Sequence, residues 1–394
     1  TPYYYPAWSY GSTARVVYEL TRRLAARGDD VTVLTSDAYD YKSRVVNDQN
    51  PVNIEGVKVF YLPNISNNLA FTRHVFIPAG APAGAFDALR NADVIHIHGF
   101  RQVMSVTASI LASREKIPYV VSAHGSALSL EGGVFTRLAY DMTVGRMVVG
   151  GAAVIHAVSE AEKKQYVKSG VDQDRIKVIY EGISLEGFNE LPLHGEFRNR
   201  HGISADRKIV LYVGTISPRK GIEFMIKAIP VLQRRDVVLV MAGNVQGAGA
   251  EKMKRLAMEL GVADRVLFAG LQSGKARLAA YRDSDITIYP TEDEAMGLIP
   301  HESLLCGTPV IVGEDCGVCE IVSRAGAGYP VEYGNTIELA SAIERLLEDR
   351  RRSKQMADRG RAFIERELSW DAVMNKYTGM YEETGKAGSG VKAR

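Results

Sequence analysis

The sequence predicts an α/β protein of two doubly wound, Rossmann-like parallel-sheet domains that face each other across a cleft. Three observations support this prediction. Short apolar runs alternate with amphipathic runs along most of the chain, which is typical of parallel β-α-β units. A polar stretch with proline and glycine, residues 186–204, interrupts this alternation and is a candidate linker. The length of 394 residues also exceeds what one ordinary hydrophobic core supports.

The first predicted domain covers residues 1–190. It opens on a loop, residues 1–11, after which Ser12 caps an amphipathic helix that ends near Gly28. The apolar runs that follow predict strands, and the periodic runs between them predict helices. Strands are expected at residues 31–35, 57–62, 94–98, 119–123, 153–158 and 176–179, and helices at residues 102–114 and from Glu160.

The second predicted domain covers residues 204–369 and repeats the same alternation. Strands are expected at residues 209–213, 237–242, 266–269, 286–289 and 310–312, and helices at 221–233, 250–260, 274–282, 337–347 and 353–367. A last helix is expected over residues 370–384. The glycine- and lysine-containing residues 385–394 are typical of a disordered tail.

Composition excludes several classes of protein. The chain is 46% hydrophobic and 24% charged with a net charge of +2, so it is globular and lacks the basic stripe that nucleic-acid binding needs. No apolar run approaches the roughly 20 residues that span a bilayer, and no signal segment opens the chain. We expect a cytoplasmic protein. Contact with the inner face of the membrane stays open because Arg137 and Arg146 lie beside apolar residues in a helix over 135–149, although ordinary packing is our preferred explanation.

Cysteine and histidine pairs raise the question of a metal. Three cysteines exclude a disulfide framework, and Cys316 and Cys319 lack the second pair that a zinc site needs or the helix start that a redox motif needs. We expect them to be small residues of a glycine-containing loop. His96 and His98 share one face of a strand without a third ligand nearby, which favours a structural role. We therefore expect no metal and no cofactor.

The stretch over residues 285–312 is the strongest candidate site. A strand breaks at Pro290 into an acidic loop that holds Glu294, and a helix starts at Leu298 with Glu302 in its first turns. Backbone N–H groups at the positive end of that helix favour an anion or sugar hydroxyls. They belong to Ala295, Met296, Gly297 and Leu298. The simpler alternative is that both glutamates are solvated caps.

Three further segments suggest ligand chemistry. Arg219 and Lys220 follow a predicted strand and precede a helix, where adjacent cations can hold a diphosphate, although most such pairs are solvated turns. Gly11 and Ser12 bring a loop to a helix N-terminus, which is a second anion site. His124 directly follows a strand and lies at the edge of the first domain's cleft. Residues 270–276 have the wrong glycine spacing for a phosphate-binding Walker loop.

Taken together, these motifs resemble the retaining GT-B glycosyltransferases of glycosyltransferase family 4. Residues 294–302 resemble that family's E-x7-E element, and residues 317–322 its G-G-x-x-E-[IV]-V loop. The glycine-rich strand that follows is matched by residues 326–331, and residues 93–99, 157–160 and 178–183 occupy the places of first-domain signatures. The resemblance extends over nearly all of the chain to about Glu383.

The resemblance implies roles for individual residues. Glu302 would bind the donor's ribose and Glu294 the transferred sugar, with the amides of residues 295–298 around the sugar and phosphate. Arg219 and Lys220 would stabilise the diphosphate leaving group. Gly11 and Ser12 would approach the phosphates, Leu271 would complete the donor contacts, and His124 would line the acceptor side. The helix from Trp370 would cross back to the first domain.

The expected activity is transfer of a hexose, with retention, from a nucleotide-diphosphate sugar (a UDP- or GDP-sugar) to a glycan or lipid-linked acceptor, without a metal. Three alternatives stay open. A nucleotide-sugar epimerase of the same fold would turn over the donor alone, and a non-catalytic module would only bind it. A glycoside hydrolase would use Glu294 and Glu302 as its carboxylate pair, about 5 to 9 Å apart.

Several positions depart from the family pattern. Thr215 stands where many members have arginine, Glu181 replaces an asparagine, and a glycine pair is reduced to Gly11 and Ser12. Relatives also open with an apolar strand just before a loop like residues 1–11, and no such strand precedes Thr1 here. We therefore hypothesise that the chain is N-terminally incomplete, because loss of a central strand leaves a gap that costs several kcal/mol.

Overall fold

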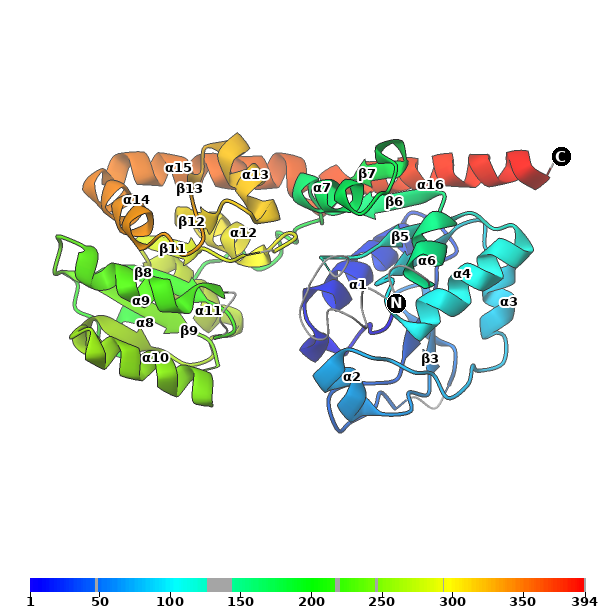
Figure 1. The fold of residues 1–394 in the computed structure, drawn as a ribbon, viewed down its shortest axis with the longest axis horizontal. Coiled ribbons are helices and arrows are strands. Elements are labelled where there is room, and N and C mark those ends of the chain that lie inside the picture. Colours follow the sequence, from blue (N-terminus) through cyan, green and yellow to red (C-terminus); the bar gives the residue numbers. More distant parts are fainter. Residues whose placement is uncertain (47–48, 126–143, 217–219, 245–246, 293, 393–394) are drawn as a thin grey trace. The chain divides into compact units, whose positions relative to one another are not determined.

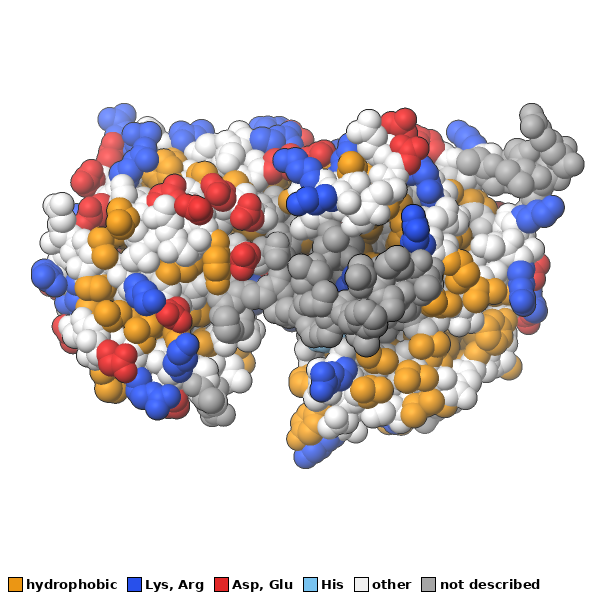
Figure 2. Space-filling view, viewed as in Figure 1, with side chains coloured by type: hydrophobic (Ala, Val, Ile, Leu, Met, Phe, Trp, Pro, Cys, Tyr) orange, Lys and Arg blue, Asp and Glu red, His pale blue; other side chains and the backbone are white. Residues whose placement is uncertain are grey.

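The computed structural model describes residues 1–46, 49–125, 144–216, 220–244, 247–292 and 294–392 (Figure 1). The chain divides into two compact units. The first comprises Thr1–Gly182 together with Trp370–Arg394, and the second comprises Ile183–Ser369. On the face drawn in Figure 2, arginine and lysine side chains are interspersed with aspartate and glutamate side chains.

The first unit contains two separate sheets. In one, β1 (Thr32–Ser36) pairs in parallel with β3 (Val57–Leu62), and β2 (Val52–Ile54) pairs antiparallel with the other edge of β3. The second sheet is parallel throughout and has the order β4 (Ile95–His98), β5 (Tyr119–Ser122), β6 (Val154–Ala157) and β7 (Ile176–Val178). Strands β1 and β4 are therefore both edge strands, and no described strand pairs with their outer edges.

Helices cover the two sheets of the first unit. They are α1 (Ser12–Ala26), α2 (Asn67–Arg73), α3 (Ala85–Arg90), α4 (Val103–Glu115), α6 (Arg146–Gly150) and α7 (Glu160–Lys168), with short 3-10 turns at Trp8–Tyr10 and Gln173–Arg175. Val16, Leu20 and Leu24 recur every fourth residue of α1 and pack as one buried stripe. The prediction that Ser12 caps α1 is wrong. Gly11 is the N-cap and Ser12 is the first helical residue, because φ of +110° at Gly11 suits only glycine.

The long helix α16 (Trp370–Lys392) belongs to the first unit. Trp370, Val373 and Tyr377 are buried against the apolar stripe of α1. A disordered tail is expected from Gly385, but the helical backbone continues to Lys392. Once the packed turns have nucleated a helix, each further residue adds one hydrogen bond, so weak helix formers can follow.

The second unit is built on one parallel sheet of six strands. Its order is β10 (Val266–Phe268), β9 (Val237–Ala242), β8 (Lys208–Val213), β11 (Ile286–Tyr289), β12 (Val310–Gly313) and β13 (Gly328–Val331). The helices are α8 (Glu196–His201), α9 (Ile222–Val231), α10 (Ala248–Glu259), α11 (Gly274–Asp283), α12 (Leu298–Leu305), α13 (Gly317–Ala325), α14 (Thr336–Glu348) and α15 (Arg350–Phe363). A 3-10 turn at Ala263–Arg265 and a π-helical turn at Ile364–Leu368 complete the unit. The central strands read as unbroken apolar runs because both faces are buried.

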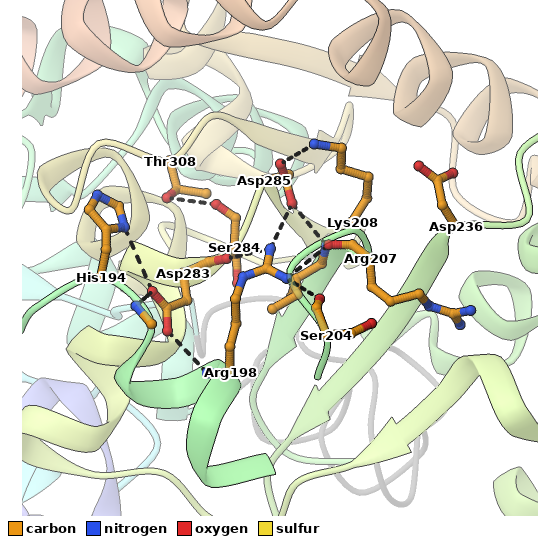
Figure 3. Close-up of polar contacts among 12 residues, drawn as sticks. His194, Arg198, Ser204, Arg207, Lys208, Asp236, Asp283, Ser284, Asp285 and Thr308 are labelled. Carbon is orange, nitrogen blue, oxygen red and sulfur yellow. Dashed lines mark hydrogen bonds and ion pairs between the residues drawn. The ribbon is translucent and has the colours of Figure 1, made fainter. Parts of the chain in front are cut away.

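The segment that the sequence suggests as a linker is a packed part of the second unit (Figure 3). It contains α8, whose Phe197 is fully buried. The buried carboxylate of Asp283, at the end of α11, accepts hydrogen bonds from the backbone N–H groups of Gly195 (2.7 Å), Phe197 (2.8 Å) and Arg198 (3.1 Å). A carboxylate at these unpaired N–H groups fixes the start of α8. The two units therefore meet in the chain at Gly182–Ile183, before this segment.

The cysteine pair lies at a helix start and not in a loop. Cys316 is the N-cap of α13 and Cys319 lies in its first turn. Burial nevertheless raises the pKa of the Cys316 thiol to about 12, and its Sγ donates a hydrogen bond to the carbonyl oxygen of Gly313 at 2.8 Å. A thiol with so high a pKa is a poor nucleophile at neutral pH. Cys316 is therefore a packing residue despite its position.

Candidate active site

The order of strands in the second unit locates its ligand-binding edge. From β8 the chain moves outward to β9 and β10, and from β11 it moves outward the other way to β12 and β13. The adjacent strands β8 and β11 thus form a topological switch point, where the loops after their carboxyl ends diverge and leave room for a ligand. The loop after β8 leads to Lys220, and the loop after β11 contains Glu294.

Lys220, Glu294 and Tyr289 form one polar cluster at this switch point. The Lys220 ammonium forms an ion pair with Oε2 of Glu294. It also donates a hydrogen bond to the Tyr289 hydroxyl at 3.3 Å and lies 5.3 Å from the centre of that ring. The Tyr289 hydroxyl donates to the same glutamate oxygen at 3.2 Å. Burial, and then the charge of Glu294, raise the pKa of Tyr289 well above its ordinary value, so its hydroxyl stays a neutral donor.

The charged pair in this cluster stays partly open to solvent. The side chains of Lys220 and Glu294 are 25% and 28% exposed, whereas Tyr289 is 5% exposed. The buried Tyr289 side chain therefore lies against the accessible Lys220 ammonium and the accessible Glu294 carboxylate. Such an arrangement can bind an anion through Lys220 and hydroxyl groups through Glu294. The predicted partner Arg219 lies outside the described residues.

Gly297 shapes the loop between Glu294 and α12. It is the N-cap of α12, with φ of +78°, and a Cβ added to it would lie 2.8 Å from the Tyr289 ring. Only glycine fits there, so the loop packs closely over the ring while the first N–H groups of α12 lack intrahelical partners. The carbonyl oxygen of Glu294 accepts a hydrogen bond from Gly317 N–H at 2.8 Å, which ties the loop to the start of α13.

His301, which lies in α12, stabilises the turn at Gly297. Its Nδ1–H donates to the carbonyl oxygen of Gly297 at 2.9 Å. The side chain is fully buried, and burial lowers its pKa to about 4. His301 is therefore neutral at ordinary pH. It stabilises the N-cap of α12 and is not suited to donate a proton.

Glu302 is held by two residues of α11. Arg277 Nη2 donates to its Oε1 at 2.9 Å, and the hydroxyl of buried Tyr281 donates to its Oε2 at 3.0 Å. The Glu302 side chain is 16% exposed. The carboxylate is thus fixed in one orientation with an edge that water can reach. Neither partner was predicted from the sequence, although their four-residue spacing on a predicted helix places them on one face. Leu271, in the loop before α11, is 79% exposed.

The first unit positions His124 at the end of β5. His124 adopts φ of +51°, and its side chain is only 5% exposed. Its Nδ1–H donates to Oε1 of Glu181 at 2.9 Å. The Nδ1–H of His98 donates to His124 Nε2, also at 2.9 Å. A carboxylate partner on Nδ1 selects the tautomer in which Nε2 is the acceptor. The sequence did not indicate this chain of three residues.

The other predicted residues of the first unit have different surroundings. Gly11 has nothing within 4 Å of a Cβ placed on it, so the loop before α1 is open on that side, and Ser12 follows at the start of the helix. His96 Nδ1 is within 2.7 Å of the Tyr381 hydroxyl, and its Nε2 is within 2.6 Å of Ser122 Oγ. Among the described residues, no group of three or more potential ligand side chains is placed to hold a metal ion.

The structure thus brings Lys220, Glu294 and Gly297 into one site in the second unit, with Glu302 on the helix that begins there. His124 and Gly11 lie in the first unit. None of the described helices combines the length and the apolar character needed to cross a membrane.

Comparison with known proteins identifies the type of enzyme. Residues 194–363 match the family described as glycosyl transferases group 1, and residues 11–182 match the glycosyl transferase 4-like domain. An uncharacterised glycosyltransferase of Methanocaldococcus jannaschii is 26% identical, over 96% of this chain and 96% of that protein. A D-inositol 3-phosphate glycosyltransferase of Thermomonospora curvata is 27% identical, over 96% of this chain and 93% of that protein.

Solved structures share the fold at lower identity. HepE of Anabaena superposes with a TM-score of 0.73 at 17% identity, over 97% of this chain and 98% of that one. Sucrose-phosphate synthase of Thermosynechococcus elongatus superposes with a TM-score of 0.69 at 22% identity, over 96% of this chain and 94% of that one. The chain is therefore a glycosyltransferase with the GT-B fold, of the type grouped in glycosyltransferase family 4.

Proposed function

We propose that this glycosyltransferase moves a hexose, with retention, from a nucleotide-diphosphate sugar to a glycan or lipid-linked acceptor. The observation that supports this most is the accessible Lys220–Glu294 pair beside the N-terminus of α12, at the switch point of the second sheet. The fold neighbour HepE has been crystallised with UDP and with UDP-glucose. A donor of that chemistry carries both an anion for Lys220 and hydroxyl groups for Glu294.

The donor's diphosphate would lie against Lys220 and the N-terminus of α12. Charge builds up on the diphosphate as its bond to the sugar breaks, and a fixed cation stabilises that charge more than it stabilises the bound donor. Arg219 would add a second cation. The helix N-terminus adds partial positive charge without a titratable group.

The two glutamates would recognise the two sugars of the donor. Glu294 would accept hydrogen bonds from hydroxyl groups of the transferred hexose, beside the amides of residues 295–298. Glu302, fixed by Arg277 and Tyr281, would accept both hydroxyl groups of the ribose. Leu271, which is largely exposed, would cover the nucleotide from the neighbouring loop. Gly11 and Ser12 would approach the phosphates from the first unit.

Retention needs the acceptor to attack on the face from which the phosphate departs. In the proposed step the acceptor oxygen bonds to the anomeric carbon as the bond to the diphosphate breaks. The departing phosphate oxygen takes the proton of the acceptor hydroxyl, so no metal and no covalent intermediate is needed. His124, with Nε2 as an acceptor, would orient the acceptor hydroxyl or a hydroxyl group of the hexose.

A calorimetric and thermal-shift screen of UDP, GDP, ADP and their sugars tests this function. We expect one diphosphate to bind wild type and to raise its melting temperature, and we expect Glu302→Ala to lose that effect. The matched control is Glu259→Ala, an exposed position in α10 that should bind as wild type does. If none of the diphosphates binds the folded protein, the donor proposal is wrong.

Product analysis distinguishes transfer from its alternatives. Acceptor-dependent release of nucleoside diphosphate, with an anomeric proton coupling that matches the donor's, supports retaining transfer. Isomerisation of the donor without an acceptor would instead identify an epimerase. Activity that EDTA leaves unchanged supports a metal-free reaction, and loss of activity that Mg²⁺ or Mn²⁺ restores would overturn that part of the proposal.

A further inference from the structure

The turn that carries His124 has an unusual backbone conformation. His124 and the following Gly125 both have positive φ, of +51° and +78°. A residue other than glycine keeps a left-handed conformation only where its surroundings hold it there. The turn lies directly after β5 and belongs to no helix or strand. The contacts that its backbone makes therefore determine the direction of the His124 side chain.

Helix α7 supplies two of these contacts. The hydroxyl oxygen of Tyr166 accepts a hydrogen bond from the backbone N–H of Ala123 at 3.2 Å. Oε1 of Glu162 accepts a hydrogen bond from the backbone N–H of Gly125 at 2.7 Å. Residues four apart lie on one face of a helix, so the two side chains point the same way from α7. The N–H groups that they bind belong to the residues on either side of His124.

The carboxylate of Glu162 also joins two neighbouring strands. Its Oε2 accepts a hydrogen bond from the backbone N–H of Val158, the residue that follows β6, at 2.8 Å. Strands β5 and β6 are adjacent in the four-stranded sheet (Figure 1). One side chain thus connects the carboxyl ends of both strands. A carboxylate can do this because each of its two oxygens is an acceptor, whereas a carboxamide has one acceptor oxygen.

These contacts differ from the usual role of a glutamate at this place in a helix. Ser159 and Glu162 have the spacing of a capping box, in which the serine oxygen binds the glutamate N–H and the glutamate side chain bonds back to the serine N–H. The first of these contacts is present, from Glu162 N–H to Ser159 Oγ at 3.1 Å. The carboxylate instead binds the N–H groups of Val158 and Gly125. Glu162 therefore does more than cap α7.

Both side chains from α7 are buried. Glu162 is 0% exposed and Tyr166 is 2% exposed. Burial raises the pKa of the Glu162 carboxyl, and its two N–H hydrogen bonds and the nearby His124 act in the opposite direction. Removal of a charge from water is costly, so stability alone does not account for a carboxylate at this position.

We propose that Glu162 and Tyr166 are positioning residues for His124. They hold the backbone on both sides of His124, while Glu181 holds its ring through Nδ1. The direction of the imidazole is then fixed from two independent elements before any ligand arrives. This inference rests on the proposed role of His124 in the transfer reaction, and its first test is therefore chosen to need no ligand.

Hydrogen exchange at the His124 ring measures the positioning directly. In the full chain labelled with ¹⁵N-histidine, the Nδ1–H of His124 is bonded to buried Glu181 and should exchange slowly with solvent. Tyr166→Phe removes the acceptor of the Ala123 N–H, and Glu162→Gln leaves one of its two N–H groups without an acceptor. We expect exchange at the His124 ring to be at least tenfold faster in each variant.

Tyr119→Phe is the matched control. Tyr119 is also 2% exposed, and its hydroxyl donates a hydrogen bond to the carbonyl oxygen of Val148 at 2.8 Å. It is the first residue of β5, at the opposite end of that strand from His124. Tyr119→Phe therefore loses a buried tyrosine hydrogen bond of the same kind, and it should leave exchange at the His124 ring unchanged.

A double-mutant cycle connects the positioning to the reaction. With whichever of UDP-glucose, GDP-glucose and ADP-glucose binds the wild type, we expect Glu162→Gln to lower kcat about 10- to 100-fold, with KM for the donor little changed. In a His124→Ala background the same replacement should have no further effect, because it acts through His124. A residue that only stabilises the fold would lower the rate in both backgrounds.

The outcomes separate this inference from the proposed function. Faster ring exchange together with a normal rate in His124→Ala supports the positioning and contradicts the role of His124 in transfer. Ring exchange that stays slow in both α7 variants, or that becomes equally fast in Tyr119→Phe, overturns the inference. Circular dichroism checks folding, and Tyr166→Phe, which removes a single hydroxyl group, decides the matter if Glu162→Gln does not fold.

Discussion

Glu181 accepts a hydrogen bond from His124 at 2.9 Å, and the two side chains are only 6% and 5% exposed. Glu181 directly precedes Gly182, and His124 lies in the turn after β5. The two residues are 57 positions apart in the chain. Through His124 Nε2 the contact continues to His98. A buried carboxylate that fixes a histidine tautomer positions that histidine without touching the ligand.

Replacement of Glu181 tests this positioning role. In Glu181→Gln the amide donates or accepts equally well, so the preference for one His124 tautomer weakens. We expect kcat to fall about 10- to 100-fold, as when comparable supporting residues are lost, with KM for the donor little changed. Nitrogen NMR shifts of the His124 ring should report the mixed tautomer. An unchanged tautomer together with a normal rate would rule out the role assigned to Glu181.

Lys220 is an accessible cation of the proposed donor site, and its loss should affect catalysis more than folding. We expect Lys220→Met to lower kcat about 100-fold or more, because a fixed donor at a developing negative charge contributes roughly 3 to 4 kcal/mol. Steady-state kinetics with the donor found in the screen provide the measurement. The control is Lys227→Met, further along α9, where the lysine pairs with Glu223 at the surface. Equal effects of the two variants would mean that charge near α9, and not the site, matters.

The close packing of Gly297 against Tyr289 can be tested by the addition of a single methyl group. Gly297→Ala combines an unfavourable φ with a contact of 2.8 Å to the Tyr289 ring, so we expect a loss of about 1–3 kcal/mol and weaker binding of the nucleotide donor. Gly247→Ala has a similar φ of +95° but no neighbour within 4 Å, and so isolates the backbone strain alone. Denaturant unfolding of both variants gives the comparison. If they lose equal stability and both bind the nucleotide normally, the close packing over Tyr289 is unimportant.

The buried histidines predict acid sensitivity of the first unit. Burial lowers the pKa of His156 to about 3, whereas an unfolded histidine titrates near pH 6.5. Between those values the unfolded chain binds more protons, so the free energy of unfolding falls as the pH falls, by about 1.4 kcal/mol per pH unit from this group. Both tryptophans, Trp8 and Trp370, lie in the first unit, so their fluorescence follows its unfolding.

A histidine variant assigns that pH dependence to its source. In His156→Gln the slope of unfolding free energy against pH, between pH 6 and pH 4, should be smaller by about 1.4 kcal/mol per pH unit. His74→Asn removes an exposed histidine and should keep the wild-type slope. The same slope in all three proteins would mean that His156 does not control acid unfolding.

The sequence predicted the strands well and some connections poorly. Buried parallel strands such as β8 and β9 are unbroken apolar runs, and their predicted limits agree with the structure to within a residue. Strand β2 was missed because it has three residues and one of them, Asn53, is polar and exposed. Helix α13 was predicted as a loop. Gly317 and two cysteines obscure the helical periodicity of its apolar residues, which are Val318, Ile321 and Val322.

The candidate site could be predicted only in part for a related reason. The E-x7-E motif is local, so the loop and helix that hold Glu294 and Glu302 could be predicted from spacing and helix signals. The partners of those glutamates come from other elements: Tyr289 ends a strand, and Arg277 and Tyr281 lie on α11. Contacts of this kind depend on the order of strands in the sheet, which hydrophobic periodicity does not reveal.

The ion pair between Lys220 and Glu294 has a consequence for selectivity. While the site is empty, each charge neutralises the other. Inorganic phosphate can pair with Lys220 only if the contact between Lys220 and Glu294 is broken. A free sugar can bind Glu294 only if the same contact is broken. A molecule that carries an anion and hydroxyl groups at the right separation compensates both at once. If the donor is a nucleotide sugar, as proposed, the pair would therefore discriminate against inorganic phosphate and free sugar in favour of the intact molecule.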